Sequence, residues 1–118
     1  MAQILIVDDQ KHIRSLLRTL LESIGHEVIE AGTRREGLCQ YRTARPDLVI
    51  TDMQMPDMNG AEMIEHLRHI VPNVKIIALS GSHGGIRDAN RLVGSQYTIR
   101  KPFSLEQFSQ TVQALLQS

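Results

Sequence analysis

Acidic, hydroxyl and basic side chains follow the short apolar runs of this chain, and their types suit phosphate chemistry. Asp8 and Asp9 follow ILIV, Asp52 follows LVIT, Ser80 follows IIAL, and Lys101 follows YTIR. If the runs are parallel strands, their carboxyl ends lie at one rim of a sheet, which is where such folds bind ligands. The five side chains are therefore predicted to converge on one site.

The three carboxylates of this set repel one another, and a cation would relieve the repulsion. With one lysine the local charge is about −2, and two carboxylates ~4 Å apart repel by roughly 4 kcal/mol at an effective dielectric constant of about 20. Oxygen ligands favour Mg²⁺ over Zn²⁺, and Mg²⁺ keeps several waters, so one or two direct carboxylates suffice. The sequence therefore predicts a Mg²⁺ site.

The same residues could carry out phosphoryl transfer. A carboxylate beside a metal and a lysine can attack phosphorus, because the cations offset its repulsion from the phosphoryl oxygens. The product would be an aspartyl phosphate. Ser80 could donate a hydrogen bond to a phosphoryl oxygen, and Lys101 could pair with the phosphate or, beforehand, with the Asp52 carboxylate.

Short apolar runs alternate with longer stretches of helical period along the chain. The runs cover residues 4–7, 28–31, 48–51, 75–79 and 97–100. Alternation of this kind is typical of a doubly wound α/β fold, in which parallel strands are joined by right-handed helical crossovers. The sequence therefore predicts five parallel strands with the polar side chains at their carboxyl ends.

The helices are predicted from apolar periodicity and from capping pairs. The first has one apolar stripe that ends at Gly25 and consists of Ile13, Leu16, Leu17, Leu20, Leu21 and Ile24. The capping pairs are Thr33 with Glu36, Asn59 with Glu62, and Ser104 with Gln107. In the last helix the residues expected to face the core are Leu105, Phe108, Val112, Leu115 and Leu116. A short fourth helix is expected over residues 86–93.

Composition narrows the class of protein. The 118 residues suit one domain, 1–118, with 13 basic and 13 acidic side chains. A net charge of zero gives no general attraction to nucleic acid or to an anionic membrane. No apolar run approaches the roughly 18 residues that cross a bilayer, and no secretory signal is visible, so we expect a cytoplasmic protein. The single Cys39 excludes an internal disulfide and a thiolate-rich zinc site.

Two other groups of residues suggest ligand sites less strongly. Glu62, His66 and His69 are spaced i, i+4 and i+7 on a predicted helix, a pattern that can hold metal but more often forms a solvated face. The SGSHGG segment at 80–85 has the glycines of a phosphate cradle but not the spacing GxxxxGK[ST] or GxGxxG. We interpret the first as a solvated helix face and the second as a loop.

Taken in order, the site motifs resemble a known family. VDD near the start, TDMQMPDMNG in the middle, ALS about 28 residues later and KPF near the end resemble the CheY-like receiver domain of bacterial two-component response regulators. The resemblance covers essentially the whole chain. It implies a flavodoxin-like strand order 2-1-3-4-5 with five helices.

The resemblance also implies a role for each site residue. Asp52 would accept the phosphoryl group from a sensor histidine kinase or phosphotransfer protein, in a reaction that the domain itself promotes. Asp9 would bind Mg²⁺ directly, and Asp8 would bind it mainly through water. The acceptor Asp52 would be a further ligand, and Gln54 would contribute its backbone carbonyl. Ser80 and Lys101 would sense the phosphate. A downstream target or output domain would respond, and the surface of helix 4 to helix 5 is the family's usual homodimer face.

The sequence departs from the family pattern just before Lys101. Thr98 stands where the family usually has a tyrosine or phenylalanine that turns inward on activation. The neighbouring Tyr97 is expected to face the other side of the strand. Phosphorylation is therefore predicted to be intact, with a switch that does not depend on an aromatic. Either Thr98 turns or the SGSHGG loop becomes ordered.

Three functions are compatible with these residues. They are a phosphorylation-controlled signalling module, a phosphohydrolase with an aspartyl intermediate, and an interaction module that no longer cycles phosphate. All five site residues are retained, which disfavours the third. A hydrolase would need a second acid-base residue and a substrate-covering insertion, and neither is visible in loops this short. The sequence therefore predicts the signalling module.

Overall fold

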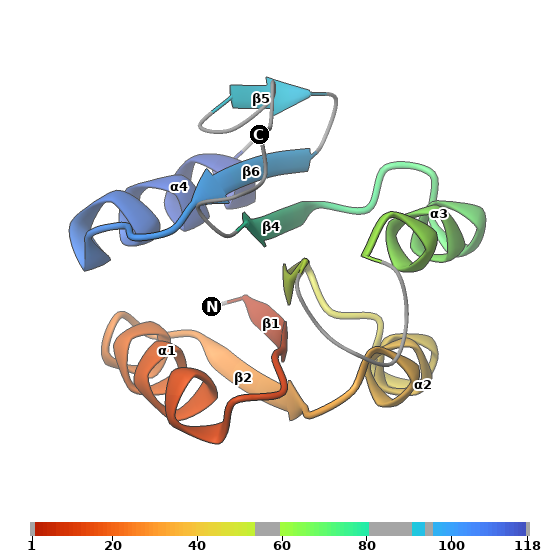
Figure 1. The fold of residues 1–118 in the computed structure, drawn as a ribbon, viewed down its shortest axis with the longest axis horizontal. Coiled ribbons are helices and arrows are strands. Elements are labelled where there is room, and N and C mark those ends of the chain that lie inside the picture. Colours follow the sequence, from red (N-terminus) through yellow and green to blue (C-terminus); the bar gives the residue numbers. More distant parts are fainter. Residues whose placement is uncertain (1, 54–59, 81–90, 94–95, 118) are drawn as a thin grey trace.

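The fold is an α/β sandwich built around one twisted sheet (Figure 1). The computed structural model describes residues 2–53, 60–80, 91–93 and 96–117. The strands are β1 (Gln3–Val7), β2 (Glu27–Ala31), β3 (Leu48–Asp52), β4 (Ile76–Ser80), β5 (Arg91–Val93) and β6 (Gln96–Arg100). The helices are α1 (Lys11–Ser23), α2 (Arg34–Ala44), α3 (Gly60–Ile70) and α4 (Leu105–Gln117).

The sheet has the order β2-β1-β3-β4-β6-β5. The first five strands in this order pair in parallel, and β5 pairs with β6 in antiparallel fashion. The parallel part confirms the predicted flavodoxin-like order, because β6 is the fifth predicted strand. Strand order reverses direction at β1 and β3, so the carboxyl ends of these strands form the crevice where such sheets bind ligands.

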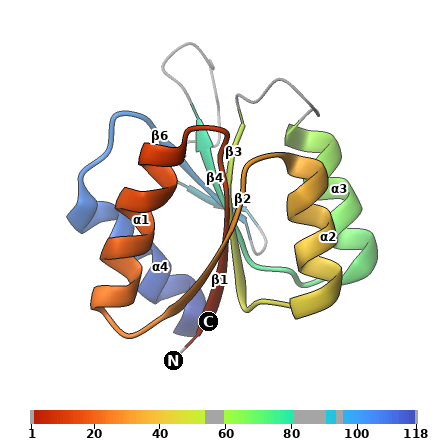
Figure 2. The same ribbon diagram turned by 90° about the horizontal axis from the view of Figure 1, so that it is seen from below.

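Helices cover both faces of the sheet, α1 and α4 on one side and α2 and α3 on the other (Figure 2). Alternate residues of the strands feed two separate cores, as the pleat requires. In β1, Ile4 and Ile6 pack with the α1 and α4 side, whereas Leu5 and Val7 pack with the α2 and α3 side. Both faces of the central strands are therefore buried, which explains why they read as continuous apolar runs rather than alternating ones.

Local signals at the helix ends agree with the predictions where the chain is described. The Thr33 hydroxyl accepts a hydrogen bond from the Glu36 N–H at 3.1 Å, and the Ser104 hydroxyl accepts one from the Gln107 N–H at 2.9 Å. Asn59, the third predicted cap, lies outside the described residues. Gly25 follows α1 with φ of 95°, a conformation that a side chain would strain.

Close packing of α2 on the sheet depends on one glycine. A Cβ at Gly37 would lie 2.7 Å from Cγ2 of Val7, closer than packed carbon atoms approach. The missing side chain lets the first turns of α2 sit directly on β1. This approach brings the amino end of α2 near the carboxyl ends of the strands.

The structure corrects two predictions about helices. Residues 91–93 of the expected fourth helix form strand β5, and residues 86–90 lie outside the described part of the chain, which contains four helices. Leu105, expected to face the core, is 42% exposed, and Leu16 and Ile24 of the first apolar stripe are 49% and 42% exposed. Leu17 and Leu21 fill the α1 side of the core, so the apolar stripe is wider than the surface that the sheet covers.

Candidate metal and phosphate site

Four of the predicted site residues converge at the carboxyl ends of β1, β3 and β6. Asp8, Asp9 and Asp52 each place a carboxylate oxygen within 4.8 Å of the others. Lys101 Nζ lies 3.3 Å from Asp52 Oδ2, which confirms the predicted ion pair. Ser80 ends β4 beside them and is 2% exposed, and its carbonyl accepts a hydrogen bond from the Lys101 N–H at 2.7 Å.

Backbone hydrogen bonds explain why these side chains meet. The Asp8 N–H donates to the Ala31 carbonyl at 3.1 Å, which extends the pairing of β1 with β2 by one residue. The Met53 N–H donates to the Leu79 carbonyl at 2.9 Å and does the same for β3 and β4. The Lys101–Pro102 peptide is cis. Gln54, the predicted source of a carbonyl ligand, lies outside the described residues.

Asp8 is the carboxylate of the cluster that is fully buried, and its negative charge is therefore costly. Burial raises the pKa of Asp8 above its ordinary value, while the Gln10 N–H, which donates to Asp8 Oδ1 at 2.9 Å, opposes the rise. Repulsion by Asp52 and Asp9 raises the pKa further, and Lys101 lowers it. Asp8 Oδ2 is buried and has no hydrogen-bond partner among the described residues. A cation bound here would satisfy this oxygen.

The donor set fits magnesium. Every ligand atom that the cluster offers is a carboxylate oxygen, and hard oxygen donors are what Mg²⁺ prefers. Among the described residues this is the one group of three or more acidic, histidine or cysteine side chains that could hold a metal ion. Glu62 and His66 are exposed and 4.0 Å apart, and they form no such group with His69. These residues are therefore a solvated helix face, as interpreted from the sequence.

Two arginines also reach the site, and the sequence reasoning missed both. Arg14 Nη1 on α1 donates to the carbonyl of Asp8 at 2.6 Å, and Arg34 Nη2 on α2 donates to the carbonyl of Asp52 at 2.6 Å. Arg14 is also held by Glu30, with 3.0 Å between Nε and Oε1. Each arginine therefore binds the backbone of a site aspartate from a flanking helix.

Comparison with known proteins places this site in a family. The model of the response regulator receiver domain matches residues 4–113. The chain belongs to the response regulator receiver family. It is 38% identical to the chemotaxis protein CheY of Thermotoga maritima over 116 residues, which cover 96% of this receiver and 93% of CheY.

Two further similarities indicate how receivers are used. The receiver is 37% identical over 105 residues to KdpE, the KDP operon transcriptional regulatory protein of Escherichia coli, and covers 47% of that longer protein. It superimposes with a TM-score of 0.82 and 32% identity on the response regulator TrrA of Thermotoga maritima, solved in complex with Mg²⁺ and BeF, covering 98% of this chain and 99% of TrrA.

The family and the geometry together establish the function in general terms. Receivers are phosphoacceptor signalling domains that bind Mg²⁺ at an acidic aspartate cluster, and this receiver has that cluster. They interact with histidine kinases or phosphotransfer proteins and with output domains. None of the helices in the described ranges has the length and apolar character that crossing a membrane requires.

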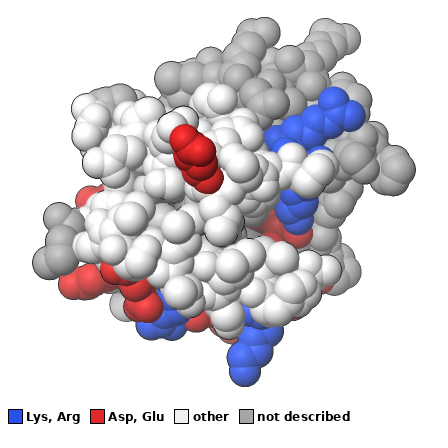
Figure 3. All heavy atoms as spheres, turned by 90° about the vertical axis from the view of Figure 1, so that its left-hand side faces the viewer, with Lys and Arg blue, Asp and Glu red and all other residues white. Residues whose placement is uncertain are grey.

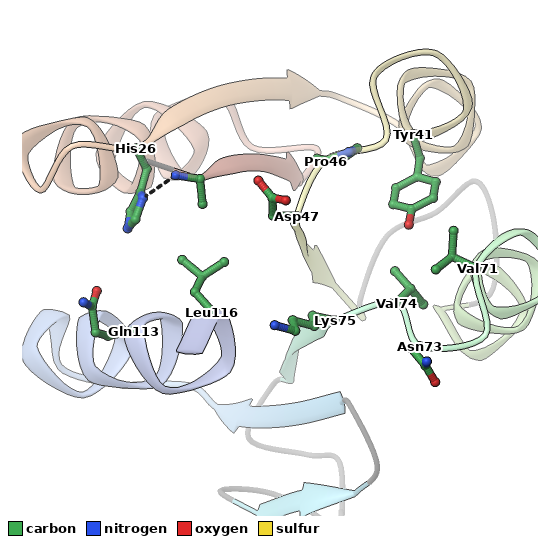
Figure 4. Close-up of a pocket in the computed structure, with 11 residues that line it drawn as sticks. His26, Tyr41, Pro46, Asp47, Val71, Asn73, Val74, Lys75, Gln113 and Leu116 are labelled. Carbon is green, nitrogen blue, oxygen red and sulfur yellow. Dashed lines mark hydrogen bonds between the residues drawn. The ribbon is translucent and has the colours of Figure 1, made fainter. Parts of the chain in front are cut away.

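A separate cavity of about 500 Å³ lies at the opposite end of the sheet (Figure 4). Its lining includes Ala2, His26, Asp47 and Lys75, each of which precedes a strand, and Leu116 near the end of α4. The Ala2 N–H donates to His26 Nδ1 at 3.3 Å across its rim. Because the acidic cluster follows the strands and this cavity precedes them, the cavity is not part of the phosphate site.

The position of Thr98 agrees with the strand alternation expected from sequence. Tyr97 packs against the core on the α1 and α4 side, and Thr98, 6% exposed, points to the opposite side of β6. The described charged groups of the site are Asp8, Asp9, Asp52 and Lys101, and Thr98 is not among them.

We therefore expect the Thr98→Ala variant to take up phosphate from acetyl phosphate at a rate within about twofold of the wild type. This ratio corresponds to a change of about 0.4 kcal/mol in the activation free energy. Initial rates of phosphorylation measure this. Ser80→Ala is the positive comparison and should react more slowly, and Thr111→Ala, which truncates a buried threonine of α4, controls for lost packing. A Thr98→Ala protein that accepts no phosphate would contradict the prediction.

Proposed function

We propose that Asp52 is the phosphoryl acceptor of this receiver and that Asp8, Asp9 and the Gln54 carbonyl bind Mg²⁺ beside it. The observation that carries this proposal is the position of the Asp52 carboxylate, 3.3 Å from the Lys101 ammonium and within 4.8 Å of two further carboxylates. Among the described carboxylates of the cluster, Asp52 is the one that forms an ion pair with Lys101.

The transfer would follow from these contacts. An oxygen of Asp52 attacks the phosphorus, the bond from phosphorus to the donor nitrogen or oxygen breaks, and its electron pair leaves with the donor. Lys101 then moves its hydrogen bond from the carboxylate to a phosphoryl oxygen, and the Ser80 hydroxyl donates to another. Bound Mg²⁺ would supply charge neutralisation for the phosphoryl oxygens. These groups belong to the receiver, so it promotes its own phosphorylation and dephosphorylation.

Reaction with a small phosphodonor tests the proposal. Purified receiver incubated with acetyl phosphate and millimolar Mg²⁺ should gain one acid-labile phosphoryl group per molecule, detected by Phos-tag electrophoresis, and a chelator should prevent the gain. An unlabelled wild type would instead support an interaction module that no longer cycles phosphate. Steady turnover of unrelated phosphate esters would support a phosphohydrolase.

The proposed partner surface lies on the side of the molecule with α1 and α4. In α4 the one charged residue is Glu106, and a large part of the surface in Figure 3 is uncharged. The three exposed large apolar residues in the described part of the chain, Leu16, Ile24 and Leu105, belong to α1, its C-cap and α4. This supports contact with a phosphodonor protein or a second receiver. A homodimer and a cytoplasmic location stay predictions, as does a single domain over 1–118.

A further inference from the structure

Among the residues that the structure describes, Arg34 is the largest whose side chain is fully buried. It is the first residue of α2, directly after the N-cap Thr33. Its Nη2 donates a hydrogen bond to the carbonyl oxygen of Asp52 at 2.6 Å. A charged side chain is almost never fully buried unless it is paired, and the Asp52 carbonyl is one such partner.

The sequence around Arg34 gives no local reason for a cation. The amino end of a helix carries a partial positive charge, which disfavours basic side chains in the first turn. The helix is already capped by the Thr33 hydroxyl, and the Glu36 carboxylate accepts from the Gly32 N–H at 3.3 Å. Arg34 therefore opposes local helix preference, and its described contact lies in the phosphate site.

The bound carbonyl belongs to the peptide that follows the proposed acceptor. The N–H of this peptide, on Met53, donates to the Leu79 carbonyl of β4 at 2.9 Å. Its carbonyl, on Asp52, accepts from Arg34. The peptide is thus held from β4 on one side and from α2 on the other. With the plane held at both ends, rotation about the Asp52 Cα–C bond is restricted, which fixes the backbone position from which the acceptor carboxylate projects.

We propose that Arg34 is a positioning residue for phosphoryl acceptance by Asp52. It acts by holding the backbone from which the acceptor side chain projects. The inference rests on the proposed function of Asp52. Arg14 binds the Asp8 carbonyl in the same way. The proposed acceptor and the proposed metal-binding residue therefore each accept a backbone hydrogen bond from an arginine.

Arg34→Met tests this role, because it keeps an apolar stem of similar length and removes every hydrogen-bond donor. The maximal rate of phosphorylation by acetyl phosphate should fall by about tenfold or more, since displacements of an ångström in a reacting group can cost about 100-fold. The half-saturating concentrations of acetyl phosphate and of Mg²⁺ should change less than about twofold, because binding of both depends on other residues. Arg34→Lys keeps one cluster of donors and should restore part of the rate.

Controls separate positioning from folding. Arg35→Met removes the same charge from the next, exposed position and should react like the wild type. Circular dichroism gives the folded fraction, and a merely structural role would lower the fraction of protein that becomes labelled but not the rate per folded molecule. Arg34→Gln, with a shorter polar side chain, carries the same expectation if the methionine variant does not fold.

The phosphorylation rates of the wild type and the variants separate the role of Arg34 from that of Asp52. A labelled wild type with a slow Arg34→Met variant supports the role. A variant that reacts at the wild-type rate overturns it, as does an equal loss in Arg35→Met. A wild type that takes no phosphate would instead contradict the proposed function of Asp52.

Discussion

The Asp52→Asn variant is expected to take up no acid-labile phosphate from acetyl phosphate, a loss larger than that of any other single substitution in the chain. The amide is isosteric with the carboxylate but is a far weaker nucleophile and carries no charge to pair with Lys101. Asp52 is 4% exposed, so an amide of the same shape keeps the packing. Electrophoretic mobility on Phos-tag gels, before and after acid treatment, measures the covalent phosphate.

Asp47→Asn is the matched control for this change. Asp47 directly precedes β3 whereas Asp52 ends it, so the two variants make the same chemical change at opposite ends of one strand. Asp47 Oδ2 accepts a hydrogen bond from the Gln3 N–H at 2.9 Å, which an amide oxygen can also accept. Asp47→Asn should be labelled at the wild-type rate. Phosphate on the Asp52→Asn protein would instead mean that Asp8 or Asp9 is the acceptor.

Much of the site could be predicted because it follows strand ends. Once the five apolar runs are taken as parallel strands, Asp8, Asp52 and Lys101 must share one rim, and their charges then predict the metal and the ion pair. The strand bounds agree with the structure to within one residue at each end. Burial on both faces makes these runs distinct, so their positions are the most strongly encoded feature of the sequence.

The arginines could not be found in this way because their contacts are made to backbone atoms. A carbonyl at a strand end leaves no trace in the sequence, and the guanidinium that binds it comes from a helix 18 residues away in the case of Arg34. One signal was present: two basic residues, Arg34 and Arg35, follow the N-cap of α2 where the helix dipole disfavours them. A residue that opposes its local preference is a candidate for a functional contact.

The exposed leucines show a different limit. Helical periodicity places Leu16 and Leu105 on the apolar side of their helices, but it does not say how much of that side the sheet covers. Both lie at the margin of the covered surface and are more than 40% exposed. Similarly, the expected helix over residues 86–93 had a weak apolar stripe, and its last three residues pair with β6 instead. Pairing with a neighbouring strand is a tertiary effect that local pattern does not report.

The Asp8→Asn variant is expected to be more stable than the wild type without metal and to lose most of the stabilisation that Mg²⁺ gives. Charges 4.8 Å apart repel by about 3.5 kcal/mol at an effective dielectric constant near 20, and Lys101 offsets part of this. We expect a net gain of about 1 kcal/mol, or roughly 4 °C in Tm. At Mg²⁺ about 100-fold over its Kd the wild type should gain about 2.7 kcal/mol and the variant much less.

The pH dependence of stability gives this prediction a second readout. The folded protein raises the pKa of Asp8 above its ordinary value of 3.8, so between the two values the folded state binds more protons than the unfolded chain. Stability then falls as pH rises through the folded pKa, and the penalty is complete above it. Asp8→Asn should lack this step in urea titrations made at successive pH values, whereas Asp47→Asn should keep it.

Mg²⁺ should oppose this effect in the wild type. The ion binds the deprotonated carboxylate, so it stabilises the fold above the raised pKa and releases as pH falls through it. The stabilisation by Mg²⁺, measured as the difference between stability with and without the ion, should therefore grow as pH rises through this interval. Parallel curves with and without Mg²⁺, or an Asp8→Asn variant that keeps the full Mg²⁺ response, would show that the ion does not bind at this carboxylate. The two curves are expected to diverge with pH because the buried acid is repelled by its neighbours when the metal is absent and attracted by the metal when it is bound.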